Sequence, residues 1–216
     1  MFVWNEDKIK WFEKAGNITD FYEGIARTCN ERSLLSKDYN ILDVGCGLGY
    51  LSMSLAPYVN SVTALDINLE AINFLNKKCR DQEISNINTL VCDWKKHEPE
   101  KKYDIVFICY CGGFCTEDFF RLAKLSSRYI VGIIPKNSFG DNFGINQLFQ
   151  PVKTYRKREN LSSATSFFKL NNISFDNIEY NCEFGQPIDN MGEYKKFMEH
   201  YFDIRDDYLL KKHSEA

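Results

Sequence analysis

The chain has 216 residues, of which 44% are hydrophobic, so it is long enough to bury one sizeable core. Its 27 basic and 30 acidic residues give a net charge of −3, which disfavours duplex DNA or bulk RNA as a partner, since proteins that bind them are more often basic. Because no apolar run approaches the roughly 18 residues of a membrane helix and the N-terminus turns acidic at once, we expect a cytoplasmic protein with no membrane partner.

The first 37 residues show helical spacing, with Thr19 or Asp20 as a candidate restart between two helices. Their apolar positions carry an aromatic stripe, which in a helix is first of all a packing face. The stripe consists of Trp4, Trp11, Phe12, Phe21 and Tyr22.

Between residues 39 and 134, short apolar runs alternate with amphipathic stretches. The expected strands are Ile41–Val44, Val62–Leu65, Asn88–Cys92, Ile105–Cys109 and Tyr129–Ile134, and the expected helices are Leu51–Ala56, Leu69–Arg80 and Glu117–Leu125, with Asn68 and Thr116 as N-caps of the last two. Regular strand–helix alternation predicts an α/β domain with a parallel sheet covered by helices on both faces.

The remainder is less regular. Residues 135–158 form a long insertion with two glycines, two prolines and a basic cluster that includes Arg156. Beyond it, the patterns favour a helix over Asn160–Leu170, a strand over Phe175–Phe184 and a helix over Gly192–Phe202. We also expect a closing edge strand over Tyr208–His213.

A glycine-rich turn follows the first expected strand. Gly45, Gly47 and Gly49 alternate, preceded by Asp43, and glycine suits a turn that a ligand approaches closely. The dinucleotide fingerprint instead spaces its glycines G-x-G-x-x-G and places a pyrophosphate there. An acid in the loop would repel a pyrophosphate but could hold an ammonium group, directly or through water, so NAD is disfavoured as the ligand.

Two further acids follow the next strands. Asp66 ends the second strand, where it can accept hydrogen bonds from ribose hydroxyls. Asp93 and Trp94 end the third, with an acid suited to an adenine amino group and a ring suited to its face. All three acids are expected at the carboxyl edge of the sheet, where open α/β folds bind ligands. A ligand with an amino group, a ribose and an adenine but no phosphate fits S-adenosylmethionine.

These segments resemble, in order, the motifs of the class I S-adenosylmethionine-dependent methyltransferases. Ile41–Tyr50 is similar to the first motif, D-x-G-x-G-x-G, and Val62–Asn68, Val91–Trp94 and Tyr103–Cys109 are similar to the second, third and fourth. The resemblance implies a doubly wound, mostly parallel sheet of the seven-stranded type, with S-adenosylmethionine as cofactor and S-adenosylhomocysteine as product. The implied cofactor-binding residues are Asp43, Gly45, Cys46, Gly47, Asp66, Ile67, Asp93, Trp94 and Cys109.

The methyl acceptor is less well defined. The segment Cys109–Cys115 lacks both the N/D-P-P-Y/F motif of many amino-methylating enzymes and the Pro-Cys pair of cytosine C5 enzymes. Tyr110, Cys111 and His200 are candidate catalytic residues. The spacing C-x-C-x3-C matches no common zinc site, so we expect these cysteines to pack or line the loop and no metal to bind.

The resemblance also suggests a division of the chain. Residues 1–37 are a candidate lid and residues 38–216 the methyltransferase domain, with Trp11, Tyr22 and Arg156 as candidate acceptor contacts. This organisation favours a small-molecule acceptor held in an enclosed pocket. An RNA or protein methyltransferase, supported by the basic cluster, and a non-catalytic module that binds the cofactor are the alternatives. The sequence leaves the oligomeric state open.

Overall fold

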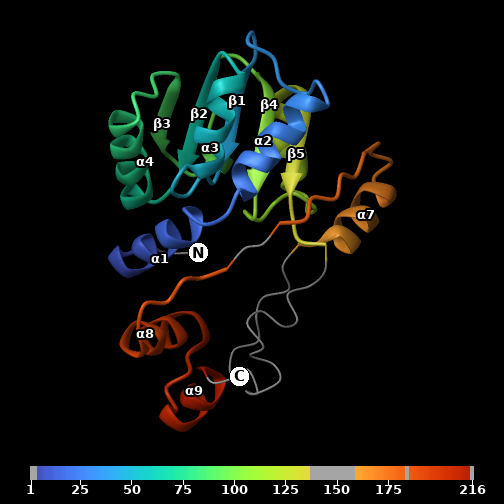
Figure 1. The fold of residues 1–216 in the computed structure, drawn as a ribbon. Coiled ribbons are helices and arrows are strands. Elements are labelled where there is room, and N and C mark those ends of the chain that lie inside the picture. Colours follow the sequence, from blue (N-terminus) through green and yellow to red (C-terminus); the bar gives the residue numbers. More distant parts are fainter. Residues whose placement is uncertain (1–3, 137–158, 183–184, 215–216) are drawn as a thin grey trace.

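The computed structural model describes residues 4–136, 159–182 and 185–214. Its centre is a sheet of five parallel strands in the order β3-β2-β1-β4-β5 (Figure 1). The strands are β1 (Asn40–Val44), β2 (Ser61–Asp66), β3 (Ile87–Val91), β4 (Tyr103–Cys109) and β5 (Ser126–Ile133). The five expected strands and their parallel arrangement are confirmed.

Helices connect the strands and cover both faces of the sheet, as expected. They are α3 (Tyr50–Leu55), α4 (Leu69–Asp81) and α5 (Phe119–Leu125), and short 3-10 turns occur at Ala56–Tyr58 and Trp94–Lys96. The Asn68 side chain accepts a hydrogen bond from the Ala71 amide and caps α4, as predicted. For α5 the predicted cap is wrong. Asp118 stands at the N-cap, and the Thr116 hydroxyl accepts from the Asp118 amide in the preceding turn.

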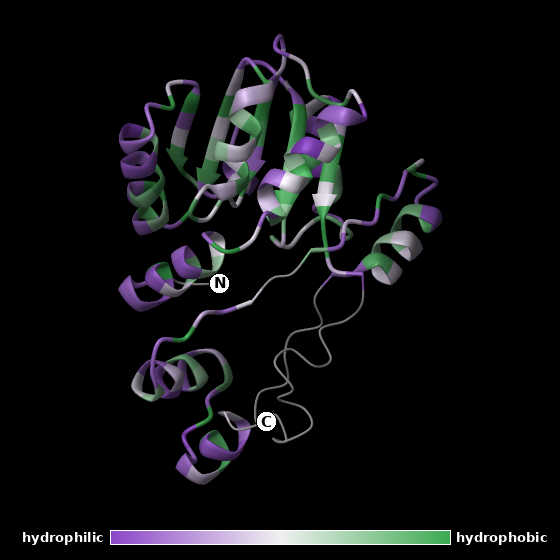
Figure 2. Cartoon of the chain, viewed as in Figure 1, coloured by the Kyte–Doolittle hydropathy of each residue, from purple (hydrophilic) through white to green (hydrophobic). Residues whose placement is uncertain are grey.

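The core follows from the alternation of strand side chains. In β1, Ile41 packs with α2 and α3 on one face, whereas Leu42 packs with α5 on the other. Both side chains are fully buried. Figure 2 shows the consequence as a hydrophobic sheet between helices whose outer surfaces are hydrophilic.

The N-terminal segment is helical, as predicted. Helix α1 (Glu6–Gly16) lies across the carboxyl edge of the sheet, and α2 (Phe21–Glu31) packs on the face that carries α3 (Figure 1). The restart is also confirmed, since Asp20 stands at the N-cap of α2 and the Thr19 hydroxyl accepts from the Phe21 amide.

The C-terminal part differs from expectation. The described residues beyond β5 form helices α7 (Leu161–Leu170), α8 (Met191–Phe202) and α9 (Asp207–Ser214), and the sheet has five strands, not seven. The predicted helices at Asn160–Leu170 and Gly192–Phe202 are confirmed, and Asn160 and Asn190 cap them. The expected edge strand Tyr208–His213 is wrong: it lies within α9, where the Asp206 side chain accepts from the Leu209 amide and starts the helix.

The expected strand Phe175–Phe184 is not formed by its described residues, 175–182. Phe175 packs on Phe168 of α7, and the Tyr180 ring fills the space beside Gly24 of α2, where its hydroxyl donates to Asp20. A side-chain contact with a helix thus replaces pairing with the sheet. Most of the insertion 135–158 lies outside the described residues. No helix in the described ranges is long and apolar enough to span a membrane.

Candidate functional site

The predicted cofactor residues gather at the carboxyl edge, where the strand order reverses between β1 and β4. From β1 the chain moves outward to β2 and β3, then returns to add β4 on the other side of β1. Such a switch point leaves a crevice in which open α/β sheets bind ligands. The turn from β1 into α3 lies at this switch point, and Gly45, Gly47 and Gly49 all have positive φ there. The sequence pattern therefore corresponds to a real left-handed backbone.

Asp43 lies beneath this turn and is buried, with 1% of its surface exposed. Its Oδ2 accepts a hydrogen bond from the Ser52 hydroxyl at 2.5 Å, whereas its Oδ1 is buried and has no partner. Burial raises the pKa of Asp43 to about 6, although the Ser52 hydrogen bond opposes the shift. An acceptor with nothing to accept is costly in a folded protein and marks a place for a donor.

Asparagine at this position is expected to stabilise the ligand-free protein at high pH. The pKa of Asp43 is higher in the folded protein than in the unfolded chain, where it is 3.8. Protonation of this group therefore raises the free energy of unfolding as the pH falls from above 6 toward 4. Asp43→Asn carries no charge to bury, so its free energy of unfolding should exceed the wild type's by about 1–3 kcal/mol at pH 8. Urea titrations at pH 8, 6 and 4.5 measure the difference, which should shrink toward pH 4.5. A difference independent of pH would contradict this account.

Asp66 ends β2 and supports the glycine turn from the side. Its Oδ2 accepts from the Gly47 amide at 2.9 Å and its Oδ1 from the Asn68 amide at 2.8 Å. Each carboxylate oxygen keeps a second lone pair, so the group can also accept from a ligand hydroxyl. Ile67 follows with 44% of its surface exposed, which gives the crevice an apolar side.

The third predicted pair lies at the end of β3. The Asp93 side chain accepts from the Lys95 amide and starts the 3-10 turn, and the Trp94 indole is buried against the carboxyl side of the sheet. A Cβ added to Gly113 would lie 2.9 Å from Cζ2 of Trp94. The indole is thus held by the segment that leaves β4.

That segment begins with Cys109, Tyr110 and Cys111. Tyr110 has φ of 50°, a conformation that bulky residues rarely adopt, and 48% of its surface is exposed. Cys111 faces the glycine turn, because a Cβ added to Gly45 would lie 2.6 Å from its Sγ. Burial, followed by the charges of Asp66 and Asp43, raises the pKa of Cys111 to about 11, and burial also raises the pKa of Cys109. Both are therefore protonated thiols at neutral pH and not activated nucleophiles.

Aromatic side chains from the N-terminal helices cover this crevice. The Trp4 and Phe12 rings are 5.2 Å apart, Tyr22 stacks on Tyr50 at 5.7 Å, and Phe21 lies 6.0 Å from Tyr110. Phe12 connects the Trp4–Phe12 pair to the Tyr22–Tyr50 pair, because its ring lies 5.8 Å from that of Tyr50. Trp4 reaches the turn itself, because a Cβ on Gly47 would lie 3.2 Å from its Cζ2. We call these side chains the aromatic cover: Trp4, Phe12, Phe21, Tyr22, Tyr50 and Tyr110.

Two candidates lie elsewhere. Trp11 is buried on the other side of α1, where its ring contacts Phe197 at 5.4 Å and His200 at 5.3 Å. These contacts with α8 are those of packing residues and do not support the predicted roles of Trp11 at the acceptor or of His200 in catalysis. Arg156 falls outside the described residues.

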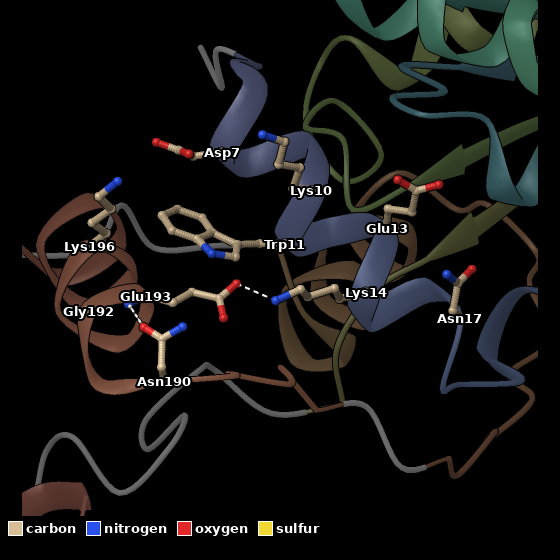
Figure 3. A pocket seen from close by; sticks show the side chains of 10 residues that line it. All are labelled: Asp7, Lys10, Trp11, Glu13, Lys14, Asn17, Asn190, Gly192, Glu193 and Lys196. Carbon is tan, nitrogen blue, oxygen red and sulfur yellow. Dashed lines mark hydrogen bonds and ion pairs between the residues drawn. The ribbon is translucent and has the colours of Figure 1, made fainter.

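A cavity of about 600 Å³ lies between α1 and α8, away from the glycine turn (Figure 3). Most of the residues that line it are charged or polar, and Lys14 pairs with Glu193 at 2.5 Å and with Asp189 at 2.6 Å. No group of three or more His, Cys, Asp or Glu side chains within the described ranges could hold a metal ion.

Sequence reasoning missed Glu159. Its carboxylate accepts hydrogen bonds from the backbone amides of Gly113, Phe114 and Cys115 at 3.1, 3.1 and 3.2 Å. Glu159 is 44 residues or more distant from these partners in the chain, so no local pattern could have revealed it.

The residues present fit the cofactor that the sequence suggests. Asp43 Oδ1 lacks a donor, which an ammonium group could supply directly or through water. The glycine turn has the left-handed backbone that the motif requires, and Asp66 keeps acceptor capacity beside it. Asp93 and Trp94 complete the set at the end of β3.

Comparisons with known proteins identify the family of this domain. Residues 35–200 match a family model described as a methyltransferase domain. Over 103 residues the chain is 39% identical to malonyl-[acyl-carrier protein] O-methyltransferase 2 of Ilyobacter polytropus, covering 44% of this chain and 39% of that protein. It is also 35% identical over 82 residues to N-methyltransferase 4 of Papaver somniferum, covering 36% and 23% of the two chains. The chain thus matches less than half the length of these curated relatives.

Solved structures share the fold. Magnesium protoporphyrin IX methyltransferase from Synechocystis, with bound S-adenosylhomocysteine, superposes with a TM-score of 0.56 at 18% identity, covering 82% of this chain and 81% of that one. A SAM-dependent methyltransferase from Aquifex aeolicus gives a TM-score of 0.52 at 17% identity, covering 67% and 77%. With the family match over most of the chain, these findings show that the protein belongs to the class I S-adenosylmethionine-dependent methyltransferases.

Proposed function

We propose that this protein transfers a methyl group from S-adenosylmethionine to a small-molecule acceptor bound between the glycine turn and the aromatic cover. The aromatic cover carries the proposal. Helices α1 and α2 carry three of its rings and Trp4 directly precedes α1, while Tyr50 and Tyr110 are the other two. Rings at this position suit an apolar, aromatic or cationic small molecule and exclude water from it. In this proposal residues 1–37 act as the lid.

In this proposal, side chains of the protein position the cofactor and bind its polar groups. Asp43 and Asp66 hold the amino group and the ribose, and Asp93 with Trp94 holds the adenine. Bound S-adenosylmethionine supplies an activated methyl group, so orientation of the acceptor and exclusion of water are the main tasks of the protein. Burial raises the pKa of Tyr22, so its hydroxyl stays protonated beside the crevice and can donate a hydrogen bond to the acceptor. Tyr110 directly follows β4, and its ring lies 6.0 Å from that of Phe21 in the aromatic cover.

The names of the relatives give different acceptors. One is named for O-methylation of a malonyl group on acyl carrier protein and another for N-methylation. The accepting atom therefore differs among proteins that share this cofactor domain. An RNA or protein acceptor had its best support in the basic cluster of residues 153–158, which lies outside the described residues.

Labelled methyl transfer from S-adenosylmethionine into a cell extract tests the proposal. The extract is separated into metabolite, RNA and protein fractions before incubation, and products are found by mass spectrometry. We expect new label in the metabolite fraction with wild-type protein and none with Asp66→Ala. Label confined to RNA or protein would overturn the small-molecule proposal, and cofactor binding without transfer to any fraction would favour a non-catalytic module.

A further inference from the structure

Glu159 stands at the downstream border of the insertion and holds the segment that leaves β4. Its Oε1 accepts from the Gly113 and Cys115 amides and its Oε2 from the Phe114 amide. Three successive amides directed at one carboxylate form a small anion-binding concavity, and the protein fills it with its own side chain. Hydrogen bonds to an ionised acceptor are about twice as strong as neutral ones.

The segment held in this way touches two parts of the cofactor site. At its start, Cys111 Sγ meets Gly45 of the glycine turn. Two residues later, Gly113 rests on the Trp94 indole at the end of β3. Residues 111–113 therefore contact both the loop after β1 and the loop after β3.

Other contacts also keep the segment folded. The Phe114 ring is buried against Phe119 and Phe168, with ring centroids 6.2 and 5.2 Å away. This anchor is apolar and lies on the core side. The backbone amides of residues 113–115 instead donate to Glu159, which directly precedes the N-cap of α7.

We propose that Glu159 is a positioning residue for the cofactor: its carboxylate fixes residues 113–115 and through them sets the spacing between the glycine turn and Trp94. This inference rests on the part of the proposed function that assigns the cofactor site, and it does not depend on the identity of the acceptor. Without the carboxylate, the protein should keep its fold through Phe114, but the crevice should lose its preformed width. Binding then includes the cost of ordering the segment.

Binding of S-adenosylhomocysteine to Glu159→Ala, Glu159→Gln and wild-type protein, measured by calorimetry, tests this. We expect the dissociation constant to rise about tenfold in Glu159→Ala, which is about 1.4 kcal/mol of binding free energy. Glutamine keeps one acceptor oxygen, but its NH₂ group faces a backbone N–H that needs an acceptor. The dissociation constant of Glu159→Gln should therefore lie between those of the wild type and Glu159→Ala. This variant also keeps the test usable if the alanine variant fails to fold.

Asn160→Ala is the matched control. Asn160 is the next residue, and its side chain accepts from the Ser163 amide and caps α7 without bonding to residues 113–115. Its loss should cost about 1 kcal/mol of stability and change the dissociation constant less than about twofold. The amide proton resonances of Gly113, Phe114 and Cys115 should move upfield in Glu159→Ala and stay in place in Asn160→Ala.

Unchanged affinity in Glu159→Ala, or an equal loss in Asn160→Ala, would overturn the inference. Because no acceptor is present, either outcome leaves the small-molecule proposal standing. Conversely, an acceptor found in RNA would leave the effect of Glu159 on cofactor binding unaltered.

Discussion

Replacing Asp66 by alanine is expected to weaken S-adenosylhomocysteine binding by about a hundredfold, the largest effect on the site that we predict. Two losses combine in this variant. The ribose loses a charged acceptor, and the Gly47 amide loses the carboxylate oxygen that holds it at 2.9 Å. The glycine turn should then move more freely, which adds an ordering cost to binding. Calorimetric titration of the purified variant with S-adenosylhomocysteine measures the change.

Asp104→Ala is the control for this variant. Asp104 lies at the opposite, amino edge of the sheet, and its carboxylate also accepts from a backbone amide, that of Asn40 at 2.9 Å. Both substitutions remove a carboxylate that holds a strand end, but only Asp66 faces the crevice. We expect the control to bind S-adenosylhomocysteine within about twofold of wild type. Wild-type affinity in Asp66→Ala would place the ribose elsewhere.

The second large effect is on stability. Gly49→Ala is expected to lower the free energy of unfolding by about 2–5 kcal/mol. Gly49 has φ of 79°, where an L side chain is strained, and its added Cβ would lie 2.3 Å from Cδ1 of Leu75. Leu75 on α4 is completely buried, so it cannot move away without disturbing the packing around it. Urea denaturation followed by circular dichroism measures the loss.

Gly112→Ala provides the comparison. A Cβ added to Gly112 would meet no atom within 4 Å, and φ there lies outside the left-handed region. We expect its unfolding midpoint to match that of the wild type. If Gly49→Ala unfolded at the same urea concentration as Gly112→Ala, the close packing of the glycine turn on α4 would be incorrect.

The central strands and helices were predictable because their patterns are local. An apolar run such as Ile105–Cys109 has few alternatives to a buried strand, and Asn68 precedes α4 as a cap whatever the rest of the chain does. The positions of Asp43, Asp66 and Asp93 were predictable for the same reason, since each lies within two residues of a strand's carboxyl end and parallel strands share that edge.

Residues beyond the central sheet were harder, because their local patterns fit more than one structure. Tyr208–His213 is short and mixed in character, and a capping contact from Asp206 decides for the helix. In the same way, residues 175–182 have strand-like composition, but the Tyr180 ring packs against Gly24 of α2.

By itself, then, the amino-acid sequence determined the sheet, the glycine turn and the three acids that point to S-adenosylmethionine, because spacing within a few residues encodes them. Only the tertiary structure decided which distant side chains meet at that edge. It brings Trp4 and Tyr22 over the turn, sends Trp11 to α8 and joins Glu159 to amides 44 to 46 residues away. Such contacts depend on how helices pack on the sheet, and packing is a property of the whole core and not of any short segment.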